Sequence, residues 1–396
     1  MPPSRILPVI VFAQFAGTSL WFAGNAVLPE LKQALGLEQE ALGLLTSAVQ
    51  LGFIAGTLCF AILSLADRVS PRLLFLLCAL LGAATNSLVV LTADSLGNVL
   101  LLRALTGFLL AGIYPVGMRI AASWYSTRLG EAIGYLVGAL VLGTAFPHLL
   151  RAIGADYEWQ TMLLLVSALA VTGGILLYLL VPNGPYMTKG ARFDIRNMAD
   201  VFSAREFRGA AFGYFGHMWE LYTFWAFIPV ILLFVLPDLS AAQISFWSFA
   251  VIAAGALGCI GGGYLSKRWG SGRVAFVQLL LSGICCLLAF FLLTPQQDFW
   301  ILGFLIFWGI VVAGDSPQFS ALTAKTAPAH LVGTALTVVT CIGFAISIVS
   351  IQTMSFVVSH LQLNQSFPTM VVGPILGLLM LYRLALRHKA KEKPVL

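Results

Sequence analysis

Residues 65–68 read Leu-Ala-Asp-Arg and lie between two long apolar runs; residues 265–268, 200 positions later, read Leu-Ser-Lys-Arg. Other pairs repeat at nearly the same distance. Pro29 and Pro229 are also 200 positions apart, whereas Pro115 and Pro317 are 202 apart. A near-constant offset across four consecutive apolar runs is hard to obtain by chance, so it predicts two halves of like topology.

The composition places both halves in a membrane. The chain has 396 residues, of which 59% are hydrophobic and 10% are charged, whereas soluble proteins are about 45–50% apolar and about 25% charged. These values exclude a disordered chain, an ordinary cytosolic enzyme and a compact nucleic-acid binder. Because a membrane-spanning helix needs about 20 mostly apolar residues, the chain has room for roughly a dozen spans.

The apolar pattern predicts an all-α membrane protein with twelve transmembrane helices, arranged as two pseudo-symmetric six-helix bundles. The N-terminal bundle covers residues 1–181, a cytoplasmic linker covers 182–208, and the C-terminal bundle with a basic tail covers 209–396. The predicted spans are 7–29, 41–65, 72–93, 97–122, 130–152, 159–181, 209–236, 243–265, 272–293, 298–322, 331–358 and 366–386.

The distribution of positive charge predicts the orientation. Eighteen of the 22 Lys and Arg residues fall on the side of the termini, and only Lys32 and Arg151 fall on the other side. Because cytoplasmic loops carry the excess of Lys and Arg, we expect both termini in the cytoplasm of a bacterial-type inner membrane. The basic tail also suits anionic lipid. The net charge of +6 is explained in this way without nucleic acid.

Cofactors and metals are not expected. The six cysteines lie in apolar stretches and show no zinc-type spacing. His217 and Glu220 form a His-x-x-Glu pair, but two ligands are too few for a zinc site. The sequence also lacks a Walker-type phosphate loop, so ATP is not expected to drive the protein.

Three motifs resemble those of the major facilitator superfamily, over essentially the whole chain. Residues 65–68, followed by Arg72, are similar to the signature loop of that family, although Leu63 and Ser70 replace its two glycines. The second copy, residues 263–270, keeps the glycines but has Lys267 in place of the acid. Residues 103–107, Arg-Ala-Leu-Thr-Gly, are similar to the Arg-x-x-x-Gly motif of span four.

The resemblance implies a conformational gate at the cytoplasmic surface. Asp67 is expected to face the N-terminal end of span eleven, where the helix dipole is positive, and to pair with basic neighbours such as Arg68 or Arg128. This contact would close the cytoplasmic side in the outward-open state, and an ordinary surface ion pair is the alternative. The predicted gating residues are Asp67, Arg68, Arg72, Arg128, Pro115 and Pro317.

Charged residues inside a span are costly, so each suggests a function. Glu220 is near the middle of span seven, with His217 one helical turn away. They are predicted to bind substrate or protons together with the aromatic residues Tyr214, Tyr222 and Trp225. The alternative is a buried Glu220–His217 pair that only holds helices together.

Asp315 lies in span ten beside Pro317, and Pro115 occupies the corresponding place in span four. Helix breaks at corresponding positions in two repeats indicate a transporter site, so Asp315 is a second candidate for binding substrate or protons. A polar group that only satisfies the broken helix is the alternative.

The remaining candidates for the binding site are arginines and amides. Arg119 would bind an anionic group or pair with an acid, or would extend toward the interface. The resemblance gives Arg103 a role in coupling or in conformational change. Gln14, Asn25 and Gln50 are candidate donors in a cavity, although polar residues of this kind also join helices.

Together these features predict a monomeric secondary transporter, not an enzyme, that moves a small-molecule substrate by alternating access with protons as the coupling ion. Alternatives are an exporter of amphipathic compounds, a nitrate-porter-like anion carrier, an intramembrane enzyme and a non-transporting scaffold. The subfamily stays open. Span five lacks the Gly-Pro pair of exporters, and spans two and eight lack the arginines of nitrate porters.

Overall fold

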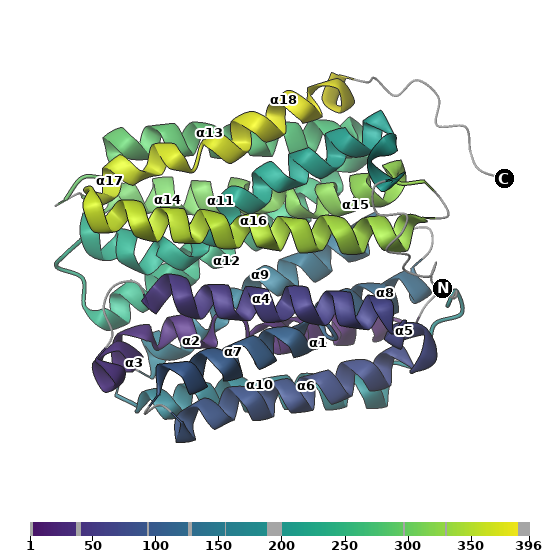
Figure 1. Ribbon diagram of the computed structural model, residues 1–396, viewed down its shortest axis with the longest axis horizontal. Coiled ribbons are helices and arrows are strands. Elements are labelled where there is room, and N and C mark those ends of the chain that lie inside the picture. Colours follow the sequence, from purple (N-terminus) through teal and green to yellow (C-terminus); the bar gives the residue numbers. More distant parts are fainter. Residues whose placement is uncertain are drawn as a thin grey trace.

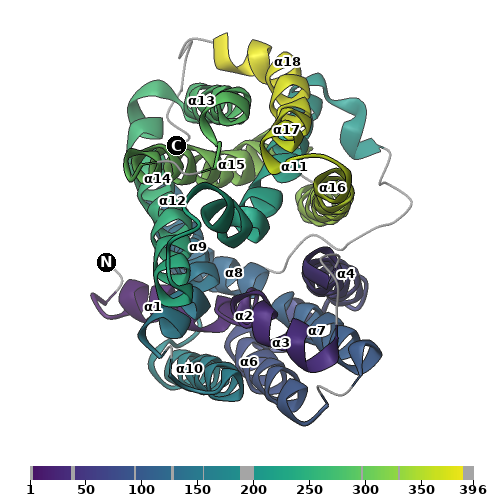
Figure 2. The same ribbon diagram turned by 90° about the vertical axis from the view of Figure 1, so that its left-hand side faces the viewer.

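The computed structural model describes residues 3–36, 41–92, 95–125, 129–154, 156–187, 200–295, 298–328 and 331–386. All regular structure within these ranges is helical. Helices of the first half occupy one side of the molecule and helices of the second half the other (Figures 1 and 2). Helix α11 begins at Arg205 and therefore takes in the end of the predicted linker.

The first half contains α1 (Ile6–Thr18), α2 (Ala23–Ala26), α3 (Leu28–Leu35), α4 (Ala41–Ile62), α5 (Leu65–Arg68), α6 (Pro71–Leu88), α7 (Leu96–Leu110), α8 (Tyr114–Trp124), α9 (Leu129–Ile153) and α10 (Trp159–Leu180). The second half contains α11 (Arg205–Val235), α12 (Ala241–Trp269), α13 (Ser271–Leu292), α14 (Trp300–Gly314), α15 (Ser316–Thr326), α16 (Val332–His360), α17 (Leu363–Ser366) and α18 (Val372–Leu386). Short 3₁₀ turns, η1 (Val89–Leu91), η3 (Asp200–Ser203) and η5 (Phe367–Thr369), join some of these helices.

Within the described ranges, eleven helical segments are long and apolar enough to cross a membrane, and α1 is a shorter apolar helix. Their outer surfaces carry many exposed leucines, such as Leu81, Leu101, Leu179 and Leu379. An apolar surface of this extent suits contact with lipid. The chain is therefore built as a multi-pass membrane protein.

Within the described residues, spans one, four and ten each contain a break. The breaks between α7 and α8 and between α14 and α15 precede Pro115 and Pro317, as expected because proline cannot donate a backbone hydrogen bond. The break at Ser19–Phe22 in the first span was not predicted, and no proline marks it.

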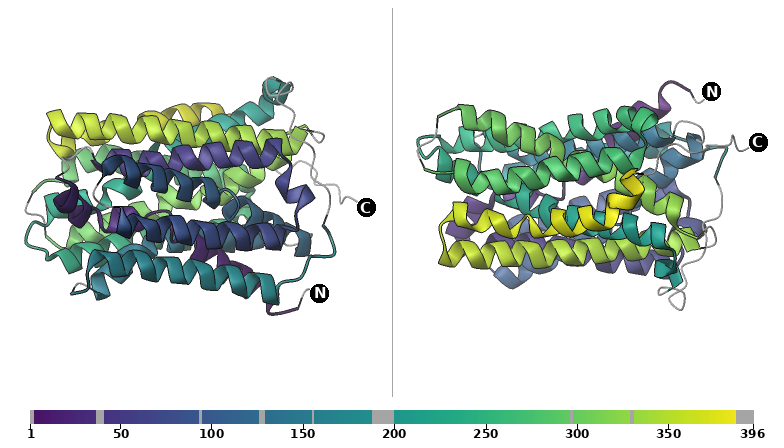
Figure 3. Two further views of the ribbon diagram at one scale, coloured as in Figure 1. Left: turned by 60° about the horizontal axis from the view of Figure 1, so that its bottom comes forward. Right: turned by 90° about the horizontal axis from the view of Figure 1, so that it is seen from above.

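The helices run along the long axis of the molecule, and the loops that connect them gather at its two ends (Figures 1 and 3). We call the end where α1 begins and α18 ends the terminal end, and the opposite end, where α3 lies, the far end. Helix α5, with the signature loop, is at the terminal end. The most extensive contact between the halves runs along α9 and α12, where Gly134 and Gly138 face Cys259 and Ile260.

Candidate substrate cavity and buried carboxyl cluster

A cavity of about 360 Å³ lies between the two halves. Its first-half wall comes from α8 and α9, and its second-half wall comes from α11, α15 and α16. The lining residues are Tyr114, Pro115, Met118, Arg119, Ala122, Ile133, Val137, Leu140, Tyr214, Met218, Leu221, Tyr222, Ser316, Ser320, Thr323, Ala324, Leu336, Val339, Thr340 and Phe344. We call this space the central cavity.

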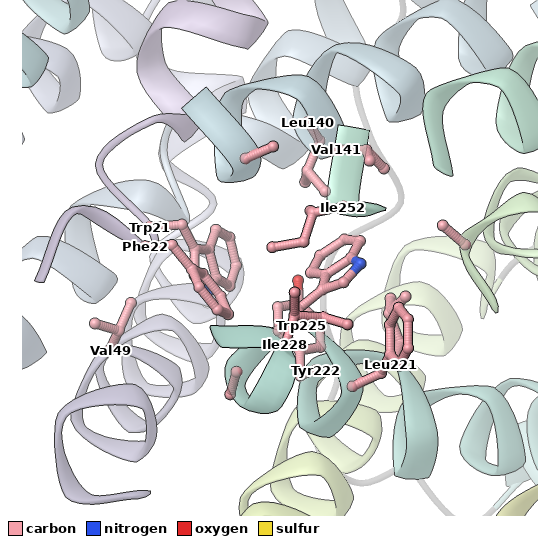
Figure 4. Close-up of a cluster of buried hydrophobic side chains, with 14 of the residues drawn as sticks. Trp21, Phe22, Val49, Leu140, Val141, Leu221, Tyr222, Trp225, Ile228 and Ile252 are labelled. Carbon is pink, nitrogen blue, oxygen red and sulfur yellow. The ribbon is translucent and has the colours of Figure 1, made fainter. Parts of the chain in front are cut away.

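Aromatic side chains close the central cavity toward the far end. Trp21 and Phe22, from the break in the first span, face Tyr222 and Trp225 of α11 (Figure 4). The six residues of this aromatic seal are Trp21, Phe22, Phe53, Tyr222, Trp225 and Phe344, and none is more than 3% exposed.

The seal joins the two halves directly. The ring centroids of Trp21 and Phe344 are 5.4 Å apart, and those of Phe53 and Phe344 are 4.5 Å apart, within the range of favourable aromatic contact. Closer to the far end, Gln352 Nε2 donates to Ser47 Oγ at 2.9 Å. The far end is thus closed by packing and by a hydrogen bond.

Toward the terminal end, a second hollow of about 280 Å³ adjoins the central cavity and shares Pro115, Arg119 and Leu336 with its lining. A third hollow shares Ala66, Asp67 and Arg119 with the second and reaches the exposed Arg68. Arg119 lines all three hollows. The three hollows therefore form a series of spaces that extends from the central cavity toward the signature loop at the terminal end.

The gate residue Asp67 forms an ion pair with Arg119 of α8, which the sequence offered as a partner for an acid. Arg68 and Arg128 were the basic neighbours expected to pair with Asp67. Arg128 lies outside the described residues. The second hollow also contains Gly333, in the first turn of α16, so Asp67 and the start of α16 line the same space. Arg72 lies over the ring of Tyr178, 5.1 Å from its centroid.

The buried acids lie in the interior of the second half and are absent from the cavity lining. His217 Nδ1 is 2.7 Å from Asp315 Oδ1, and both side chains are fully buried. Ser282 Oγ, from α13, donates to Glu220 Oε2 at 2.8 Å, and Cys286 Sγ is 3.5 Å from the same oxygen. Trp308 Nε1 donates to Ser282 Oγ at 3.2 Å. Glu220 is thus held by α13, and His217 by Asp315.

The cluster retains unused hydrogen-bonding capacity. Within the described part of the chain, Glu220 Oε1, Asp315 Oδ2 and His217 Nε2 have no hydrogen-bond partner. When both are ionised, the carboxylates of Asp315 and Glu220 repel each other electrostatically. Buried polar groups without partners are rare in native proteins. Their presence here suits groups that take up and release protons.

Arg103 is buried in the first half, away from the central cavity. Its guanidinium donates to the carbonyl oxygens of Leu20 and Trp21 at 2.9 and 2.7 Å, and to Asn86 Oδ1 at 2.8 Å. Those two carbonyls lie in the break of the first span. Arg103 therefore holds the segment that presents Trp21 and Phe22 to the seal.

The predicted amide donors also lie inside the first half and are not part of the central cavity's lining. Gln14 packs against Gly117 of α8, Asn25 Nδ2 donates to Thr46 Oγ1 at 2.8 Å, and Gln50 is fully buried. Pro317 is buried at the start of α15. Of the predicted site residues, the structure brings Arg119, Pro115, Tyr214 and Tyr222 to the central cavity and Trp225 to the seal.

Several cavity residues were missed by sequence reasoning. Met118, Met218, Ser320 and Phe344 look like ordinary residues of apolar helices, and only their place between the halves marks them. For metals, the described residues contain no group of three or more His, Cys, Asp or Glu side chains able to hold an ion.

The comparisons with known proteins agree with this architecture. The sequence profile described as "Major Facilitator Superfamily" matches residues 10–351. The crystal structure of the human organic anion transporter MFSD10 (TETRAN) is similar, with a TM-score of 0.75 and 16% identity over 96% of this chain and 100% of that chain. The proton:xylose symporter XylE bound to 6-bromo-6-deoxy-D-glucose is similar, with a TM-score of 0.76 and 12% identity over 96% of each chain. A comparison with the curated proteins gives no match.

Proposed function

Because the chain belongs to the major facilitator superfamily, we propose that it is a proton-coupled secondary active transporter that moves a small solute by alternating access. Membership makes it a transport protein, not an enzyme. The two similar structures are named for a sugar and for organic anions, so the shared fold does not identify the solute.

One observation carries the alternating-access proposal: a cavity between the two halves is sealed at the far end and continues toward the terminal end. Transporters built from two repeats bind substrate at the repeat interface and move one half against the other. With the termini in the cytoplasm of an inner membrane, as the charge bias predicts, the structure is the inward-facing state.

Proton coupling is proposed for the cluster of Glu220, Asp315 and His217. A charge in the hydrocarbon region is costly, and this cluster buries two acids, of which Asp315 is paired with His217 and Glu220 is bonded to Ser282. Tyr214, Met218 and Ser316, which line the central cavity, adjoin the cluster in sequence. A change in the protonation of the cluster would therefore shift the neighbouring residues that line the central cavity.

The test is uptake into proteoliposomes with and without an imposed pH gradient, for Glu220→Gln and for the matched control Glu206→Gln. Both acids belong to α11, but Glu206 is exposed at its first turn. We expect Glu220→Gln to reach normal membrane levels and retain solute exchange, because its shape is kept, but to lose accumulation driven by the gradient.

The outcomes separate the parts of the proposal. If Glu220→Gln still concentrates solute, Glu220 is not the coupling site and Asp315 becomes the next candidate. Exchange without chemical change supports a transporter, whereas a modified product would indicate an enzyme and absence of flux would indicate a scaffold.

A further inference from the structure

The walls of the central cavity indicate which solutes it accepts. Most are aliphatic or aromatic side chains, with hydroxyl groups from Ser316, Ser320, Thr323 and Thr340. Among the described residues of this lining, Arg119 is the only one with a charge. The carboxyl groups of Glu220 and Asp315 are behind the wall. A cation in this cavity would find no acid to pair with, and a buried unpaired charge is strongly unfavourable.

Arg119 is within reach of two different partners. It lines the central cavity and at the same time forms the ion pair with Asp67. The pair is partly solvated, since the side chains of Arg119 and Asp67 are 25% and 21% exposed. Because water screens part of the attraction between partly solvated charges, replacing Asp67 by another anion costs little free energy.

Guanidinium groups bind carboxylates well because their donors form a planar fork that matches two oxygens. The apolar walls favour a solute whose body is apolar or aromatic, since small-molecule sites combine such walls with a few placed polar groups. An anion with an apolar body satisfies both features. A small inorganic anion would leave the apolar walls without contact.

We propose, on the basis of the transport function above, that the substrate is an organic anion with an apolar or aromatic body, and that its anionic group binds Arg119 in place of Asp67. The exchange has a consequence for the gate. Once released, Asp67 faces the first turn of α16 across the second hollow, and the start of a helix attracts negative charge. Substrate binding thereby favours closure of the terminal end.

The test uses three probes of nearly equal size: 2-naphthoate, 2-naphthamide and 2-naphthylmethylammonium. Binding is measured by thermal shift and by quenching of tryptophan fluorescence, on the full-length protein in nanodiscs. We expect naphthoate to bind at least tenfold more tightly than the amide and the ammonium compound. Arg119→Gln should abolish this preference, and Arg119→Lys should restore part of it. Arg268→Gln, an exposed arginine at the same end, should leave the preference unchanged.

Asp67→Asn tests the exchange itself. Because the competing carboxylate is removed, naphthoate should bind several-fold more tightly, whereas binding of the amide should not change. A preference for the ammonium probe, or a preference for naphthoate that survives in Arg119→Gln, would overturn the anion assignment. Unchanged naphthoate affinity in Asp67→Asn would overturn the exchange.

Counterflow of the same three probes in proteoliposomes distinguishes this inference from the transport function on which it rests. Exchange of naphthoate supports both. Exchange of only the amide or the ammonium probe leaves the transporter intact and overturns the anion assignment. Absence of exchange for all three overturns the anion assignment and leaves the transport function standing, because a transporter of a different solute would give the same result.

Discussion

At the scale of single residues, Arg103 has a structural role: it holds helices together, although its motif suggested a role in function. Its guanidinium is 1% exposed and is satisfied by two backbone carbonyls and by Asn86. Asn86 in turn donates to Leu163 O and Ser167 Oγ of α10. One side chain thus links the break of the first span to α6 and α10.

Arg103→Gln should lower the thermal unfolding midpoint, because the shorter neutral side chain leaves carbonyl oxygens of Leu20 and Trp21 without donors. Hydrogen bonds to charged groups contribute about 1.5–3 kcal/mol each. Thermal unfolding in detergent checks this, with Arg268→Gln as the exposed control. Equal midpoints for the two variants would show that the break does not depend on Arg103.

The pairing of His217 shows what a sequence can and cannot give at this scale. Because burying a charge is costly, the sequence predicts that Glu220, His217 and Asp315 belong to a functional site. Helical spacing suggests that His217 contacts Glu220. In the structure His217 contacts Asp315, and Glu220 is bonded to Ser282. Spacing along one helix says nothing of residues that another helix supplies, so the residue types were predictable but the partners were not.

At the scale of helices, glycines decide how closely two spans approach. A Cβ atom on Gly107 of α7 would lie 1.9 Å from the carbonyl oxygen of Val49 on α4. The glycine of the Arg-x-x-x-Gly motif is therefore required by close packing. Gly303 of α14, in contrast, has no atom within 4 Å of such a Cβ.

Gly107→Val should prevent α4 and α7 from packing, and Gly303→Val should be tolerated. We expect the first variant to be lost or aggregated and the second to elute like the wild type. Membrane levels and size-exclusion profiles measure the difference. A monodisperse Gly107→Val protein would mean that α7 can move away from α4 at little cost.

Helix breaks differ in how well they can be predicted. Pro115 and Pro317 mark the breaks in spans four and ten, because proline removes a backbone donor wherever it occurs. The break at Ser19–Phe22 has no such local mark. It is held by Arg103, more than 80 residues along the chain, and by packing of Trp21 against the other half. Contacts between residues so far apart in the sequence form only when the helices assemble, so the sequence alone does not indicate them.

At the scale of the whole molecule, the orientation is open to a direct test. A reporter fused after Leu396 and another inserted near Lys189 should both report the cytoplasm, because 18 of the 22 basic residues lie on that side. The measurement uses two reporters: a phosphatase that is active in the periplasm and a fluorescent protein that fluoresces in the cytoplasm. A periplasmic signal at either site would contradict the twelve-span arrangement.

The last prediction concerns the gate at Asp67 and the side from which the central cavity can be reached. Ser320→Cys, in the central cavity, should react with a membrane-impermeant thiol reagent from the cytoplasmic side only, above the level given by the six native cysteines. Adding Asp67→Asn should raise the rate, because the neutral side chain cannot hold the start of α16. Labelling from the other side would contradict the closed far end, whereas an unchanged rate in Asp67→Asn would reduce Asp67 to a surface ion pair.

The position of Arg103 also bears on how the chain enters the membrane. An arginine inside a span opposes insertion, by up to about 2.5–3.5 kcal/mol where it lies at the centre. Its hydrogen-bond acceptors, the carbonyls of Leu20 and Trp21 and the amide of Asn86, belong to spans one and three, which leave the ribosome first. Span four therefore meets its acceptors already in the bilayer, and biogenesis of the first half depends on the order of synthesis.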